Sequence, residues 1–191
     1  MSERNPPWQV CGIAGSLRSG SFNRALLRAA RELAPPELDI VILDTLAGVP
    51  LFNADVEAEG DPASVVQLKE AIAAADGLLL VTPEYNAGIP GPMKNAVDWA
   101  SRRHRDGPPV LKGKPTAIMG ATPGRLATAR AQANLRVSLA NTGAVVMDSP
   151  QVHVMQARER IVDGELVDED SQRFVRNMLE AFAAWIARFS D

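Results

Sequence analysis

The fold is decided by the stretch WQVCGIAGSLRSGSFN, residues 8–23. Its apolar start predicts a buried strand over 8–14, and residues 24–34 place leucine and alanine at helical spacing. A polar, glycine-containing loop therefore joins a strand to a helix N-terminus, where Ser21 or Asn23 can act as the N-cap. Unpaired amides at a helix N-terminus, serine hydroxyls and the guanidinium of Arg18 together predict a site for a phosphate ester.

Two other kinds of phosphate loop do not fit this stretch. Gly15 and Gly20 stand five apart, as in nucleotide-hydrolysing P-loops, but Ser21 occupies the place of the lysine that those loops require. The three-glycine pattern of dinucleotide-binding folds also fails after Gly12. Phosphoryl transfer is therefore not expected.

Length and composition indicate one domain and limit the partners. The chain has 191 residues, of which 46% are hydrophobic, so we expect a single domain over residues 1–191. The formal net charge is −3 and no basic stripe is present, which makes nucleic acid an unexpected partner. We find no apolar segment of the kind that exports or anchors a chain, so we expect a cytoplasmic protein with no membrane partner.

The residues with the most reactive side chains do not form a catalytic or metal-binding pattern. Cys11 is the single cysteine and lies in the first predicted strand, which favours a packed thiol. His104 and His153 are far apart and have no neighbours at metal-ligand spacing. We therefore predict no catalytic side chain and no metal site, and any chemistry has to come from a bound cofactor.

Strand and helix patterns alternate along the chain. Further strands are predicted at 38–43, 77–81, 115–120 and 144–147. The helices between and after them are predicted to begin at Pro62, to follow the loop at Pro83, and to cover 126–141 and 171–190. Alternation of this kind predicts an α/β fold: a flavodoxin-like three-layer sandwich with a five-stranded parallel sheet of order 2-1-3-4-5 and helices on both faces.

Two smaller features concern the C-terminal third of the chain. Residues 160–167 contain an Asp-Gly pair between short apolar runs, which predicts a β-hairpin. The last helix is expected to turn its large apolar residues inward, namely Phe174, Met178, Phe182, Trp185 and Phe189.

A second unusual loop is expected beside the first. In this strand order ligands lie at the carboxyl ends of the first and third strands, which brings 16–23 next to 82–91. The second loop is rich in proline and glycine, so its exposed backbone can lie against a planar heterocycle, with Tyr85 shielding an edge and Asn86 offering a donor and an acceptor. Taken alone, a tight strand-to-helix connection explains it equally well. The neighbouring phosphate loop favours a binding site.

Residues 15–23 (GSLRSGSFN), 83–86 (PEYN) and 90–99 (PGPMKNAVDW) resemble the NADPH-dependent FMN reductase family, and the resemblance covers nearly the whole chain. It implies a flavodoxin-like fold, tightly held FMN, NADPH or NADH as co-substrate, and reduction of flavins, quinones, azo dyes or chromate. If FMN is bound, one face of its ring has to stay open for NAD(P)H and then for the acceptor, which predicts alternating, ping-pong turnover. The residues that it implies around the FMN phosphate and ribityl chain are Ser16, Arg18, Ser21, Phe22 and Asn23. Those that it implies along the isoalloxazine ring are Pro83, Glu84, Tyr85 and Asn86.

The resemblance is weaker in a third segment, residues 120–126. This segment is expected to close the pocket through Thr122. Its Thr122-Pro123 pair departs from the serine- and glycine-rich sequence that is usual at this place in the family. A flavodoxin-type electron carrier without nicotinamide oxidation and a flavin-free binding module remain as alternatives. The chain lacks the strongly acidic face by which such carriers dock, and this weighs against the first of them.

The resemblance also implies a homodimer or homotetramer with a small-molecule electron acceptor. The residues that can face a partner chain are Ile89, Met93, Val97 and Trp99, although core packing is the default for helix-spaced apolar residues. The basic run 102–105 can hold a nicotinamide phosphate or can be a solvated helix end. The solvated end is the favoured interpretation.

Overall fold

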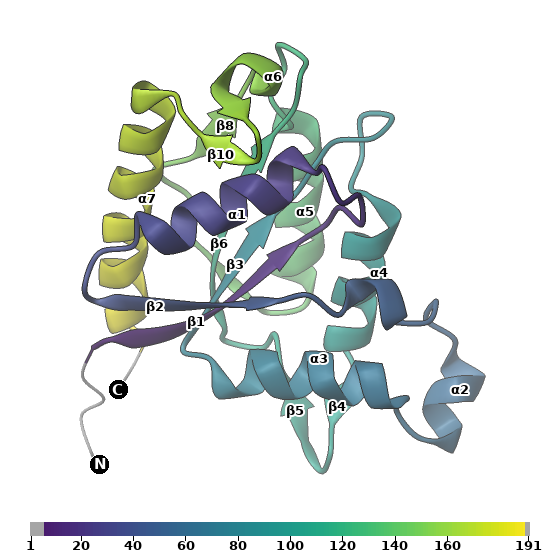
Figure 1. Ribbon diagram of the computed structural model, residues 1–191. Helices are drawn as coiled ribbons and strands as arrows, with labels where there is room; N and C mark the ends of the chain where they lie inside the picture. Colours follow the sequence, from purple (N-terminus) through teal and green to yellow (C-terminus); the bar gives the residue numbers. More distant parts are fainter. Residues whose placement is uncertain (1–5, 190–191) are drawn as a thin grey trace.

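A parallel sheet forms the centre of the computed structural model, which describes residues 6–189. Its strand order is β2-β1-β3-β6-β7, with β8 also paired to β6, so the predicted flavodoxin-like order is confirmed (Figure 1). The strands are β1 (Trp8–Ala14), β2 (Leu38–Leu43), β3 (Gly77–Val81), β6 (Pro115–Ala121), β7 (Val145–Val146) and β8 (Val152–Val154). Every pairing within this sheet is parallel.

The fifth position of the sheet differs from the prediction of one strand over 144–147. Only Val145–Val146 forms β7, which pairs with the start of β6 at Pro115 and Thr116. After an interruption the chain returns as β8, which pairs with Met119–Ala121 at the other end of β6. Two short strands therefore share one edge, and the second of them lies beside the end of β6 where the site is expected.

Helices cover both faces of the sheet. On one face α1 (Phe22–Glu32) and α7 (Glu169–Ala187) enclose one apolar core, and on the other α3 (Ala63–Ala74), α4 (Gly91–Ala100) and α5 (Ala129–Asn141) enclose a second (Figure 1). Side chains alternate between these cores along a strand, as Leu79 and Leu80 of β3 do. This alternation explains why β3 is apolar at every position, because both of its faces are covered.

The region between β2 and α3 contains short helical pieces. These are a 3₁₀ turn at Leu46–Gly48 and α2 (Ala54–Glu59). The remaining small elements are β4 (Arg103–His104), β5 (Gly107–Pro109), α6 (Ala157–Arg160), β9 (Ile161–Val162) and β10 (Glu165–Leu166). The predicted hairpin at 160–167 is confirmed, with positive φ at both Asp163 and Gly164.

The buried side of α7 was only partly predicted. Met178 and Phe182 are buried as expected and Trp185 is half-buried, but Phe174 is 52% exposed and Phe189 44% exposed. The buried stripe is Val175, Met178, Leu179, Phe182, Ala183 and Ile186. Residues at three- and four-residue spacing thus face the core, and of the four aromatic residues predicted to face inward only Phe182 is fully buried in this stripe. The predicted end of this helix at Ser190 lies outside the described residues.

Burial settles two further expectations. Cys11 is buried, and this burial raises the pKa of its thiol to about 12, so the packed-thiol prediction is confirmed. Met93, Val97 and Trp99 are buried in the core beneath α4, which is the default interpretation of their spacing, while Ile89 is partly buried against them.

Candidate functional site

The loop after β1 leaves its backbone donors free. The amide of Gly15 donates to the Val81 carbonyl at 2.9 Å, which ties the loop to the end of β3. From Ser16 to Phe22, no amide donates a hydrogen bond within the described residues. The Ser21 hydroxyl accepts from the amides of Asn23 and Arg24 at 3.2 and 3.3 Å, so Ser21 is the N-cap of α1. A run of free amides at the positive end of a helix is suited to an anion.

Two side chains add to this anion site. Arg18 is exposed and forms no ion pair within residues 6–189, so its guanidinium is available to a ligand. The Ser16 side chain is buried, yet its hydroxyl makes no hydrogen bond to the described part of the chain. A Cβ on Gly20 would meet nothing within 4 Å, so this part of the loop borders open space. The free amides and these side chains fit the phosphate group of FMN.

The side chain of Asn23 has its hydrogen-bond partners within the protein. Its side chain is 3% exposed and forms a pair of 2.9 Å hydrogen bonds with one residue of β6. The amide nitrogen donates to the Ala121 carbonyl, and the side-chain oxygen accepts from the Ala121 amide. Asn23 therefore fixes the start of α1 against the end of β6, where the third segment begins.

The second loop forms a tight turn at the end of β3. Tyr85 and Gly88 exchange hydrogen bonds of 3.3 and 2.9 Å, and both residues between them have positive φ, 51° at Asn86 and 61° at Ala87. This is the geometry of a two-residue hairpin turn. Tyr85 is 48% exposed and Asn86 is also exposed, so a ring and an amide project from a fixed backbone. Pro83, by contrast, is buried.

Glu84 anchors this turn to α5. Its carboxylate accepts from the amides of Arg130 and Ala131 at 3.0 and 3.1 Å and forms an ion pair with the Arg130 guanidinium. The side chain is 8% exposed. Burial raises its pKa, but the hydrogen bonds from Arg130 and Ala131 outweigh burial and leave the pKa below its ordinary value. The side-chain amide of Asn134 also donates a hydrogen bond to the Ala87 carbonyl at 3.3 Å. Sequence reasoning did not identify these α5 partners, because nothing in the spacing of residues 84 and 130 links them.

The third segment lies beside β8. Thr122 donates its amide to the Val154 carbonyl at 3.0 Å and accepts from the Ala157 amide at 3.0 Å. Ala127 and Thr128 have φ of 43° and 64°, and for this reason α5 begins at Ala129 and not at the predicted position 126. A Cβ on Gly120 would lie 2.3 Å from the Thr128 hydroxyl and 2.4 Å from the Thr82 carbonyl, so only glycine fits there.

The basic run 102–105 lies away from this site. Arg102 pairs with Glu57 at 2.9 Å, and Arg105 pairs with Glu70. The pairing raises the pKa of Arg102 through the hydrogen bond and the charge of Glu57. Both guanidinium groups therefore have protein carboxylates as partners, in agreement with a structural role for the run.

The predicted residues come together in three segments at the carboxyl ends of β1, β3 and β6. Asn23 links the first segment to the third, and the Gly15 amide links the first loop to β3. Four of the predicted ligand contacts use their side chains within the protein: Ser21, Asn23, Glu84 and Thr122. The side chains of Ser16, Arg18, Tyr85 and Asn86 form no hydrogen bond or ion pair with the described residues, so they can meet a ligand together with the free amides of the first loop. Of the remaining two predicted contacts, Pro83 is buried and Phe22 packs half-buried against the core.

Within the part of the chain that the structure describes, no helix is both long enough and apolar enough to cross a membrane.

Comparison with known proteins shows the family of the chain. Residues 8–159 match the family described as NADPH-dependent FMN reductase. The chain is 43% identical to an NAD(P)H-dependent FMN reductase of Pseudomonas aeruginosa, over 94% of this chain and 96% of that protein. It is 40% identical to a quinone reductase of Escherichia coli with the same coverage. Among solved structures, the flavoenzyme NAD(P)H:(acceptor) oxidoreductase FerB of Paracoccus denitrificans superposes with a TM-score of 0.85 at 36% identity, covering 95% of this chain and 98% of that one. The chain belongs to the NADPH-dependent FMN reductase family.

Proposed function

We propose that this protein transfers electrons from NAD(P)H to small quinones, using FMN held between residues 15–23 and the 85–88 turn. Its family consists of oxidoreductases, and FMN and NAD(P)H are the cofactor and co-substrate that the family and its relatives indicate. The observation that carries the proposed site is the run of unpaired amides from Ser16 to Phe22 at the N-terminus of α1. Quinone is the proposed acceptor because relatives at 39% and 40% identity are named for quinone reduction.

The protein's own part in the reaction is to bind and orient. Arg18, the Ser16 hydroxyl and the free amides would hold the phosphate, and the projecting ring of Tyr85 would cover an edge of the flavin. Hydride transfer from a nicotinamide to the flavin N5 is chemistry that bound FMN supplies. No acid or base from the chain is required.

Stabilisation of the reduced flavin falls to the second loop in this proposal. Bound FMN would gain negative charge on its ring during turnover, and backbone or side-chain N–H groups of the chain would stabilise that charge. The Tyr85 amide already donates to Gly88 at 3.3 Å, whereas the Asn86 amide donates no hydrogen bond within the described residues. We therefore assign this role to the amide and side chain of Asn86. Glu84, held by Arg130 and Ala131, keeps the turn in place.

We infer the reaction order from the side of the ring that the two loops would leave open. The loops form one wall, so one face of the ring remains for NAD(P)H and then for the quinone, which predicts ping-pong turnover. Steady-state rates at several fixed quinone concentrations should give parallel double-reciprocal lines. Intersecting lines would show that both substrates bind at once and would contradict this order.

An anaerobic absorption spectrum of the FMN-loaded protein tests the proposal directly. Bleaching of the flavin band by NADPH or NADH, followed by recovery of the band after a quinone is added, is the expected result. A bound flavin that stays oxidised with both donors would favour the electron-carrier alternative. Failure to bind FMN would contradict the assignment of both loops.

A further inference from the structure

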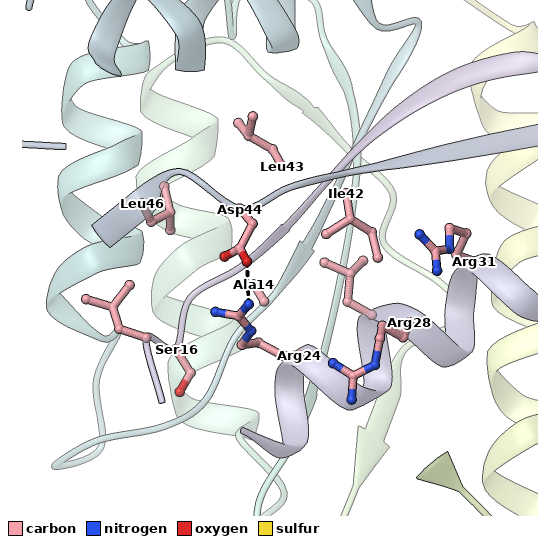
Figure 2. A pocket seen from close by; sticks show the side chains of 11 residues that line it. Ala14, Ser16, Arg24, Arg28, Arg31, Ile42, Leu43, Asp44 and Leu46 are labelled. Carbon is pink, nitrogen blue, oxygen red and sulfur yellow. Dashed lines mark hydrogen bonds and ion pairs between the residues drawn. The ribbon is translucent and has the colours of Figure 1, made fainter. Parts of the chain in front are cut away.

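A second basic site lies next to the phosphate loop. Arg24, Arg28 and Arg31 recur at three- and four-residue spacing, so they lie along one stripe of α1. All three line a cavity of about 230 Å³ between α1 and the carboxyl end of β2 (Figure 2). Figure 2 shows Leu43, Asp44 and Leu46 across the cavity from the helix. The sequence carried this signal in the spacing of the arginines, but the prediction of this helix used only its apolar positions.

The charges of this arginine cavity are not balanced. Arg24 forms an ion pair with Asp44, the one acidic residue in the lining. Arg28 donates to the Gly164 carbonyl at 3.1 Å, a contact with a neutral group that leaves its charge uncompensated. Arg31 is exposed and forms no ion pair within residues 6–189. Two guanidinium groups at the cavity are therefore available to an anion.

The rest of the lining restricts the shape of the occupant. Apart from Ser16 and Asp44, the rest of the lining is apolar and consists of Leu27 on α1 itself and of Ala14, Leu17, Ile42, Leu43 and Leu46. Small-molecule sites usually measure about 300–1,000 Å³, so this volume suits one part of a larger ligand. Ser16 belongs both to this cavity and to the loop assigned to the FMN phosphate. An occupant would thus combine an anionic group with a less polar body and would lie beside the bound flavin phosphate.

We propose that the arginine cavity is a subsite for the phosphorylated adenosine part of a dinucleotide, with Arg28 and Arg31 binding its phosphate. The inference rests on the proposed function, which brings nicotinamide and flavin nucleotides to this end of the sheet. The same chemistry has two sources: the 2′-phosphoadenosine of NADPH, and the adenosine diphosphate of FAD bound in place of FMN. Arg102 and Arg105, the other basic residues considered for this role, are already paired with glutamates.

Calorimetric titration of the purified protein with 2′,5′-ADP and with 5′-ADP, each with and without added FMN, tests the proposal. In Arg31→Ala the tighter-binding probe should lose about tenfold in affinity, the lower end expected for a charge-assisted hydrogen bond. Arg173→Ala is the matched control, because Arg173 is an exposed helical arginine on α7, away from the cavity, whose contacts are the ion pair with Asp170 and the ring of Phe174. Arg31 is exposed and forms no hydrogen bond or ion pair with residues 6–189, so its loss should not unfold the protein.

The two probes separate the sources. Tighter binding of 2′,5′-ADP, with the KM for NADPH raised in Arg31→Ala and that for NADH unchanged, supports the NADPH source. Tighter binding of 5′-ADP in the FMN-free protein, with FAD affinity reduced and FMN affinity unchanged, supports the FAD source. If each probe binds the wild type and Arg31→Ala with the same affinity, the proposal is overturned.

A second variant should act in the opposite direction. Asp44→Asn removes the carboxylate that pairs with Arg24 and so adds a third available guanidinium to the cavity. Because the pair is exposed, the affinity for the preferred probe should rise by up to about fivefold. A fall in affinity would contradict the assignment. These titrations need no turnover, so they remain informative if the protein binds no FMN, which would contradict the proposed function alone.

Discussion

Asn23→Ala should destabilise the protein and loosen the candidate site together. The side chain of Asn23 joins α1 to β6 through a pair of 2.9 Å hydrogen bonds, and both bonds involve the backbone of Ala121. Both residues are buried. Removing the amide leaves a buried N–H and a buried C=O of Ala121 without this partner.

The magnitude follows from these two backbone groups. An unsatisfied buried donor or acceptor costs about 1–3 kcal/mol, so the pair sets a range of about 2–6 kcal/mol. We expect about 3 kcal/mol, because the neighbouring loop borders solvent and can let water reach part of the gap. Since Asn23 holds the phosphate loop against the third segment, FMN affinity should fall in the same variant.

Urea unfolding followed by circular dichroism measures the change in the free energy of unfolding, and flavin fluorescence measures FMN affinity. Asn134→Ala is the matched control, because Asn134 is exposed and makes a single 3.3 Å bond to the Ala87 carbonyl. The control should change stability by no more than about 0.5 kcal/mol. A loss below about 1 kcal/mol in Asn23→Ala, within the ordinary effect of one hydrogen bond, would refute the reasoning.

Four further changes test the site and its supports. Arg18→Ala should weaken FMN binding roughly ten- to a hundredfold through loss of a charge-assisted hydrogen bond, and unchanged affinity in a fluorescence titration would remove Arg18 from the phosphate site. Ala87→Gly should raise the free energy of unfolding by about 1 kcal/mol, because φ is 61° there and glycine adopts this conformation without the Cβ penalty; destabilisation in urea would contradict that reason. Cys11→Ser should leave kcat for quinone reduction unchanged, since the buried thiol has a pKa of about 12, and lost activity in a folded variant would contradict the packed-thiol assignment. Glu84→Gln should be less stable than the wild type at pH 7, and the difference in stability should shrink as the pH falls below about 4.5. The reason is that a carboxylate with a lowered pKa contributes stability above its unfolded pKa and loses this contribution on protonation. A difference that does not change with pH would point to packing.

Local patterns predicted the elements of the fold well where one residue type dominates. The run of leucines in 77–81 gave β3 with its observed bounds, and the Asp-Gly pair gave the hairpin. The predictions failed where several faces compete. In α7 the stripe that is buried is set by its contact with the sheet, and the aromatic rings of Phe174 and Phe189 lie outside it.

The candidate site shows the same division. The motifs located the loops, but they did not reveal which side chains form hydrogen bonds within the protein and which are left for a ligand. Ser21 and Asn23 both follow the phosphate loop, yet one caps α1 and the other binds β6. The carboxylate of Glu84 is directed at α5, which is distant in sequence. Such partners depend on how helices dock on the sheet, and no local pattern encodes that.

By itself, the sequence determined the strand order, the family resemblance and the position of an anion-binding loop, because periodicity, turn residues and helix N-termini act over a few neighbouring residues. Only the tertiary structure decided that the amides of residues 16–22 stay unpaired, that α5 anchors the 85–88 turn, and that the stripe of arginines on α1 faces a cavity beside β2. Each of these depends on groups far apart in the chain, whose hydrogen bonds and charges are fixed only when the helices pack against the sheet.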